Sequence, residues 1–88
     1  MREIAIPTIN MNGDDPQKLL NGLAEAIECA YQLKHAIAAV EYDNGRNADN
    51  FEHAQEMREL KHEMISQANN IEVTLIAITR GIQKQMRK

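Results

Sequence analysis

The stretch FEHAQEMRELKHEMISQANNIEVTLIAITRGIQKQM, residues 51–86, decides the fold. Apolar or small residues recur along it three and four positions apart, provided that the polar Lys61 is allowed between Met57 and Met64. The members of this seam are Ala54, Met57, Met64, Ala68, Ile71, Leu75, Ile78 and Ile82. Such spacing keeps one side of an α-helix apolar over about five heptads. The β-branched run 71–78 is also typical of a strand, but its helical flanks favour one long helix over 51–86.

A second amphipathic stretch precedes it and predicts a helix over 15–42. Asp15 is the expected N-cap, and Pro16 suits the first helical position. The seam that follows is Leu19, Leu23, Ala26, Ala30, Leu33, Ile37 and Val40. Asp43, Asn44 and Gly45 are turn residues that would end the helix near Tyr42. Gly22 costs about 1 kcal/mol in a helix interior, which suggests close approach by another segment.

The connection 43–50 is short compared with the two helices and predicts an antiparallel hairpin, with Asp49 or Asn50 as the second N-cap. Folding about the middle of this loop places Leu33 beside Leu60. The same register places Ala30 beside Met64 and Ala26 beside Ala68. One of Asn69 and Asn70 is expected at the helix interface, where a polar residue fixes register or oligomeric state.

Residues 1–13 differ from the rest, because Pro7 disfavours a helix and Asn12-Gly13 is a turn signal. We interpret them as an extended arm that lays Ile4, Ile6, Ile9 and Met11 along the overhanging end of the second helix. A frayed tail is the alternative. The whole chain of 88 residues then forms one helical-hairpin domain.

Several aliphatic residues lie off the main seams, and a lone hairpin would leave them in water. They are Leu20, Ile27, Val73 and Ile76, and Ile71 and Ile78 of the apolar run 71–78 join them in the candidate set. A two-helix hairpin has one internal interface, which rarely offsets the loss of chain entropy. We therefore expect these residues to form an oligomer interface, most simply in a homodimeric four-helix bundle or else in a higher oligomer.

Composition restricts the compartment and the class of partner. The formal net charge of −3 argues against a general nucleic-acid binder. The only cysteine, Cys29, cannot form an internal disulfide, which favours a reducing compartment. No apolar run reaches the length of about 18 residues that spans a bilayer. The expectation is a cytoplasmic protein that binds neither membrane nor cofactor.

Candidate chemistry is sparse. Glu59 and His62 have the Glu-x-x-His spacing of di-iron carboxylate bundles, but the hairpin register sets Lys34 opposite them. We therefore favour the interpretation that Glu59 and His62 belong to a charged, solvent-exposed face of the helix. His35 and His62 are expected near Tyr31 across the hairpin, as surface or interface groups. Cys29 is expected to be a buried or half-buried small hydrophobe.

Two groups of basic residues are the candidate ligand sites. Arg80, Lys84 and Arg87 follow one another at the end of the second helix, where cations interact favourably with the helix dipole. Phosphate binding is the alternative role. Arg46, with Asn44 and Asn47 beside it, either binds a phosphate or carboxylate or caps the first helix.

Three short motifs carry a resemblance. The opening Ile6-Pro-Thr-Ile-Asn-Met-Asn-Gly13, followed by Leu19-Leu20 and by Asn44-Gly-Arg46 between two helices, resembles small phage and prophage proteins of unknown function. The chain departs from their Asp- and Tyr-containing continuation, because Asn47-Ala-Asp-Asn-Phe51 follows here. The resemblance implies a viral protein that acts inside the infected cell without enzymatic activity. Its architecture is also similar to helical-hairpin phage proteins that oligomerise and sequester nucleotide immune signals.

Three functions follow as hypotheses. The first is a non-enzymatic, homo-oligomeric protein that binds and modulates a host or viral protein, as in counter-defence. The second is an oligomer that sequesters a nucleotide or another phosphate-bearing ligand through its basic residues. The third is a metal-dependent enzyme built on Glu59 and His62. A shared fold cannot separate the three.

Overall fold

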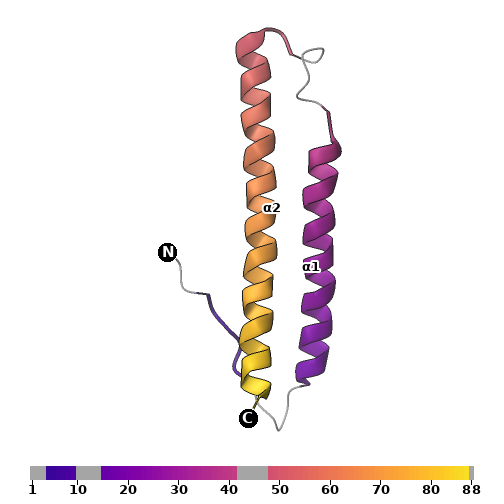
Figure 1. The fold of residues 1–88 in the computed structure, drawn as a ribbon, viewed down its shortest axis with the longest axis vertical. Coiled ribbons are helices and arrows are strands. Elements are labelled where there is room, and N and C mark those ends of the chain that lie inside the picture. Colours follow the sequence, from indigo (N-terminus) through magenta and orange to yellow (C-terminus); the bar gives the residue numbers. More distant parts are fainter. Residues whose placement is uncertain (1–3, 10–14, 42–47, 88) are drawn as a thin grey trace.

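Two α-helices packed side by side make up the described part of the protein. The structure, a computed structural model, describes residues 4–9, 15–41 and 48–87. Helix α1 spans Pro16–Ala39 and helix α2 spans Phe51–Met86 (Figure 1). The two run antiparallel as a hairpin, and the expected all-α class is confirmed. The residues 71–78, for which a strand was the alternative, are helical.

Both helices begin at the side chains that the sequence offers as caps. The Asp15 carboxylate accepts hydrogen bonds from the backbone N–H groups of Gln17 and Lys18, at 3.1 and 3.3 Å. Asn50, rather than Asp49, caps α2, because its side-chain oxygen accepts from the N–H of His53 at 2.8 Å. Each bond satisfies a helical N–H that has no partner within its helix.

Helix α2 has the bounds expected from its pattern, whereas α1 ends three residues early. Val40 is already extended, and its N–H donates to the carbonyl oxygen of Ile37 at 3.1 Å, which closes the last turn. The connection therefore begins at Val40 and runs to Asn50. The expected turn at Asp43, Asn44 and Gly45 lies outside the described residues.

The expected register of the hairpin is wrong. Lys34 on α1 contacts Asn69 and Glu72 on α2, at 3.1 and 2.9 Å. The sequence register set Lys34 opposite residue 59 or 60, about 18 Å from residue 72 along a helix, which no lysine side chain can span. Leu33 and Leu60, expected to pack together, are 50% and 51% exposed.

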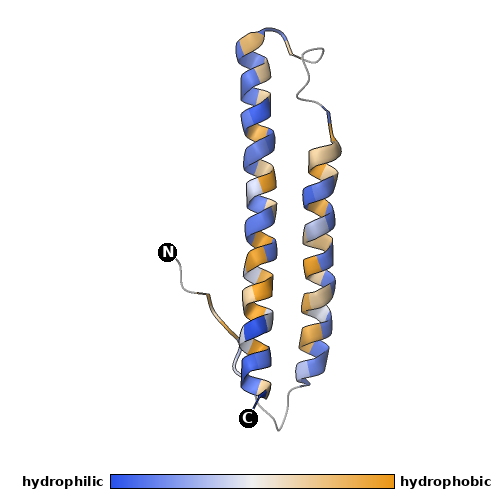
Figure 2. Cartoon of the chain, in the orientation of Figure 1, coloured by the Kyte–Doolittle hydropathy of each residue, from blue (hydrophilic) through white to orange (hydrophobic). Residues whose placement is uncertain are grey.

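The shift has a physical reason in the hydropathy of α2. Its first turns carry Glu52, Glu56, Glu59 and Glu63 and are mostly hydrophilic, residues 71–79 are mostly hydrophobic, and the last turns are hydrophilic again (Figure 2). Sliding α1 away from the connection places its apolar side against the more apolar part of α2. Folding symmetrically about the loop would instead have packed the apolar side of α1 against the charged first turns of α2.

The buried core of the described residues is small. Ala30, Ala54, Ala68 and Ile82 are its only buried side chains, and no charged or polar one joins them. The molecule measures 61 × 25 × 17 Å, and its radius of gyration of 18.4 Å exceeds the value of about 12 Å typical of a compact chain of this length. Neither described helix is long and apolar enough to cross a bilayer.

The N-terminal segment 4–9 is neither helix nor strand and lies against the last turns of α2 (Figure 1). The side chain of Gln85 holds it twice: its oxygen accepts from the N–H of Ile9 at 2.9 Å, and its nitrogen donates to the carbonyl oxygen of Pro7 at 2.7 Å. Ile6 rests on Gly81, where an added Cβ would come within 2.6 Å of the Ile6 Cγ2. Met11 and the rest of 10–14 lie outside the described residues.

The two glycines of the helices have opposite surroundings. A Cβ at Gly22 would meet no atom of the described residues within 4 Å, so none of them makes the close approach expected there. The close approach occurs at Gly81, where Ile6 lies against the helix. Gly81 carries the same sequence signal as Gly22, a glycine inside a predicted helix.

Candidate interaction surfaces and basic site

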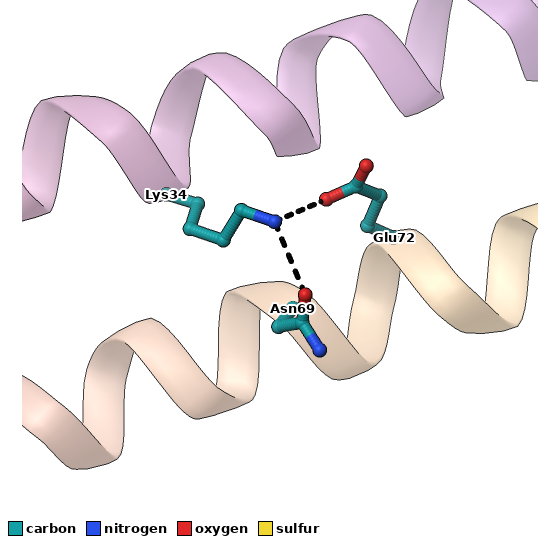
Figure 3. A network of polar contacts seen from close by, with 3 residues as sticks. All are labelled: Lys34, Asn69 and Glu72. Atoms are coloured by element: carbon teal, nitrogen blue, oxygen red, sulfur yellow. Dashed lines mark hydrogen bonds and ion pairs between the residues drawn. The ribbon is translucent and has the colours of Figure 1, made fainter.

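A polar network joins the two helices on one side of the hairpin (Figure 3). The ammonium of Lys34 donates to Asn69 and forms an ion pair with Glu72 at 2.9 Å. The Lys34 and Glu72 side chains retain only 24% and 16% of their exposure, so the pair is partly removed from water. Asn69 is thus the interface asparagine that the sequence anticipated, and its partner is a lysine.

Aromatic contacts extend this network along α1. The rings of Tyr31 and His35 lie 4.3 Å apart between centroids, and the Lys34 Nζ sits 5.7 Å from the Tyr31 ring. The sequence placed Tyr31 and His35 near His62 across the hairpin, but the ring contact lies within α1, and the approach of His62 rested on the register that the Lys34–Glu72 contact overturns. We call the side of the hairpin that carries Tyr31, Lys34, Asn69 and Glu72 the Lys34 face.

The basic end of α2 forms a second feature. Arg80, Gln83, Lys84 and Arg87 line an open surface hollow of about 370 Å³. Arg80 and Lys84 lie one turn apart on one side of α2, and Arg87, three residues further on, is the extended residue that follows its last turn. All three are exposed. The structure thus brings together Arg80, Lys84 and Arg87, which sequence reasoning named, and adds Gln83, which it missed.

Other expected site residues are not joined. Arg46, Asn44 and Asn47 lie outside the described residues. Within the described ranges no group of three or more His, Cys, Asp or Glu side chains is placed to hold a metal ion, so Glu59 and His62 gather no further ligands there. His53 instead accepts a hydrogen bond at its Nδ1 from the N–H of Asp49, at 3.0 Å.

The residues expected at an oligomer interface divide into two groups. Ile71 and Val73 are 53% and 54% exposed. Leu20, Ile27, Ile76 and Ile78 are half-buried. Cys29 is exposed, so its expected burial is wrong; it lies one position before the buried Ala30 and points away from the helix interface. Large apolar side chains also stand exposed at Leu19, Leu33, Val40 and Leu60.

Comparison with known proteins adds no relative to this description. No family model, curated protein or solved structure matches the chain.

Proposed function

We propose that this protein is a non-enzymatic interaction protein that works as a homo-oligomer, most simply as a homodimeric four-helix bundle. One observation carries the proposal: the chain exposes far more surface than a folded monomer of its size. Its accessible surface is 6983 Å², against about 5,200 Å² for a monomeric protein of 10.0 kDa. The excess of about 1,700 Å² is what one subunit of an obligate dimer covers.

The composition of the exposed surface supports the same function. Half of each side chain of Leu33, Leu60, Ile71 and Val73 remains exposed, while the buried aliphatic core is one isoleucine and three alanines. At about 25 cal/mol per Å² of apolar surface, such a core stabilises the fold far less than chain entropy opposes it. A second copy would supply the missing apolar contacts.

Light scattering coupled to size exclusion, at micromolar concentration, tests the oligomer. We expect a mass of at least twice the 10.0 kDa of one chain. A folded species of 10.0 kDa at this concentration would overturn the proposal. The solvent-facing sides of the bundle would bind the partner, which the resemblance to phage proteins suggests is a host or viral protein in the cytoplasm of an infected cell. Binding of a partner is tested by capturing such a protein with the natural oligomer. Capture should be lost in a variant that light scattering shows to be monomeric.

The basic hollow favours one alternative function, the binding of a nucleotide or another phosphate-bearing ligand. Three exposed cations around a concave surface present several N–H donors to phosphate oxygens. Thermal shift with inorganic phosphate, ATP and cyclic nucleotides tests it, because a bound ligand raises stability by RT ln(1 + [L]/Kd). We expect a shift that is lost in Arg80→Gln/Lys84→Gln and kept in a matched Lys18→Gln variant. If no compound shifts the unfolding temperature, the phosphate-binding function is wrong. The favourable interaction with the helix dipole then remains as the role of these cations.

A further inference from the structure

The side of the hairpin opposite the Lys34 face is apolar and open. On α1, Lys34 and Leu33 flank the line of the buried Ala30 on opposite sides, since they lie four and three residues after it. On α2, Glu72 and Ile71 flank the line of the buried Ala68 in the same way. Because Lys34 meets Glu72 on one side, Leu33 and Ile71 share the other side. We call this side the open face.

The α1 half of the open face is a stripe with strict heptad spacing. Its members are Leu19, Gly22, Ala26, Cys29, Leu33, Ala36 and Val40, which alternate steps of three and four residues. Gly22, Cys29 and Ala36 are exposed, and Gly22 has open space where a Cβ would stand. Small residues at every second position would let another helix approach to the short end of the usual distance of about 8–10 Å.

The α2 half continues the same face. Its members are Leu60, Met64, Gln67, Ile71, Thr74 and Ile78, again at steps compatible with a heptad. The same series reaches Gly81 and Gln85, the two residues that hold the N-terminal segment 4–9. Leu60 and Ile71 are about half exposed. No charged side chain belongs to either stripe.

The α1 stripe is symmetric about Cys29. Reversing the helix around Cys29 sets Leu33 against Ala26, Ala36 against Gly22 and Val40 against Leu19. Leu33 thus meets a smaller residue and Ala36 meets another small one, whereas Val40 and Leu19 are both large. Because alternating steps of three and four residues map onto themselves when a helix is reversed, two copies of this stripe can pack antiparallel in an isologous dimer.

The α2 stripe has its own centre at Ile71, at about the height of Cys29. Side chains of an α-helix point toward the N-terminus of their own helix. Because α1 and α2 are antiparallel, the side chains of Lys34 and Glu72 point toward one another when they form their ion pair. Their Cα atoms are therefore offset along the helix axes by about one turn. Counting five residues back from Lys34 then places Cys29 within about one turn of Ile71. Reversing α2 about Ile71 sets Ile78 of one copy against Met64 of the other. It sets Leu60 against the part of α2 that Ile6 covers.

We propose that the open face is the homodimer interface, with the two hairpins antiparallel and the two-fold axis lying in the interface, across both helices at the height of Cys29 and Ile71. This inference rests on the proposed homo-oligomeric function and specifies its geometry. It places α1 on α1 and α2 on α2 across the interface, with each Cys29 facing Cys29 of the second copy. The surface excess of about 1,700 Å² per chain exceeds the area of about 800 Å² that a standard interface covers on each partner.

The natural cysteine provides the test. Two cysteines form a disulfide only when their Cα atoms lie within about 4.4–6.8 Å, which on α1 requires a position at the two-fold axis. We expect diamide, which takes up the two electrons and two protons of the thiols, to convert the folded protein into a reducible covalent dimer. A short bismaleimide should give the same dimer without demanding disulfide geometry. Both reactions should be faster in the folded protein than in the urea-unfolded chain.

A matched control moves the thiol by one residue. Glu28 is exposed like Cys29 but points about 100° away around α1, off the open face. Glu28→Cys in a Cys29→Ser background should cross-link no faster folded than unfolded. The Cys29→Ser variant alone, measured by light scattering, reports the oligomer without any thiol.

The outcomes separate this inference from the function on which it rests. A monomer by light scattering would overturn both. A dimer in which Cys29 fails to cross-link with either reagent, or in which Glu28→Cys cross-links instead, would overturn the antiparallel open-face geometry and leave the homo-oligomeric function in place.

Discussion

Lys34 joins the two helices through one ammonium group, which meets both Asn69 and Glu72 (Figure 3). Because the Lys34–Glu72 pair is partly buried, loss of the lysine alone leaves a carboxylate with reduced access to water. We expect Lys34→Met to lower the free energy of unfolding by about 1 kcal/mol.

A double-mutant cycle with Glu72→Gln checks this at fixed protein concentration by urea denaturation. The coupling between the two substitutions should be about 0.5–1 kcal/mol and should shrink as salt is added. Zero coupling at low salt would show that the contact adds no stability and that packing alone sets the hairpin register.

Gly81 and Gly22 make a matched pair of residues inside helices. Alanine in place of glycine favours the helix by about 1 kcal/mol, but at Gly81 the new Cβ would displace Ile6. We expect Gly81→Ala to stabilise the protein more in an Ile6→Ala background than in the natural chain.

Gly22→Ala is the control for this cycle. No atom of the residues that the structure describes lies within 4 Å of a Cβ at Gly22, so the effect of Gly22→Ala should not depend on Ile6→Ala. Midpoints of urea unfolding measure all the variants. An equal gain at Gly81 in both backgrounds would show that the contact between Ile6 and Gly81 has no energetic consequence.

At the scale of the elements, the two helix starts follow from single side chains. Asn50 accepts from the N–H of His53, whereas the Asp49 carboxylate is 92% exposed and lies 3.7 Å from the His53 ring nitrogen. We expect Asn50→Ala to cost about 1 kcal/mol, as is usual for a lost N-cap, and Asn50→Asp to cost little. Asp49→Ala, measured by the same denaturation curves, should cost clearly less than Asn50→Ala. The reverse order would reassign the cap to Asp49.

The sequence predicts these elements well because their signals are local. Helical periodicity over 51–86 and the pair Asp15-Pro16 depend on neighbouring residues only. The end of α1 and the hairpin register depend on how apolar the opposite helix is at each level, which no local signal reports. Folding about the loop centre therefore misplaced Leu33 and Leu60, and the contact between Lys34 and Glu72 was not foreseen.

The candidate sites likewise divide into features that local spacing predicts and features that depend on tertiary contacts. Arg80 and Lys84 lie one turn apart and Arg87 follows the last turn of α2 at any hairpin register, so their grouping was predictable. Gln83 belongs to the same group by its spacing along α2, whereas the pairing of Gln85 with the N-terminal segment depends on contacts far apart along the chain. The open face could be recognised only once Lys34 had fixed which flank of each helix is closed.

At the scale of the whole molecule, charge is distributed unevenly along α2. Residues 52–63 contain four glutamates, one arginine and one lysine, a net charge of −2, whereas residues 80–87 contain three cations and no acid, a net charge of +3. An antiparallel dimer centred near Ile71 brings the basic end of each α2 to the level of the acidic segment of the other. A parallel dimer would set like charges together.

Salt therefore distinguishes the two arrangements. Attraction between the oppositely charged ends acts over about 10 Å at 0.1 M salt and is screened at higher concentration. We expect the dimer dissociation constant, measured by sedimentation equilibrium, to rise several-fold between about 0.02 M and about 0.5 M NaCl. Arg80→Gln/Arg87→Gln should flatten this dependence, because these side chains carry most of the positive end. Salt that tightens the dimer instead would indicate like charges at the same level, and the two copies would then run parallel.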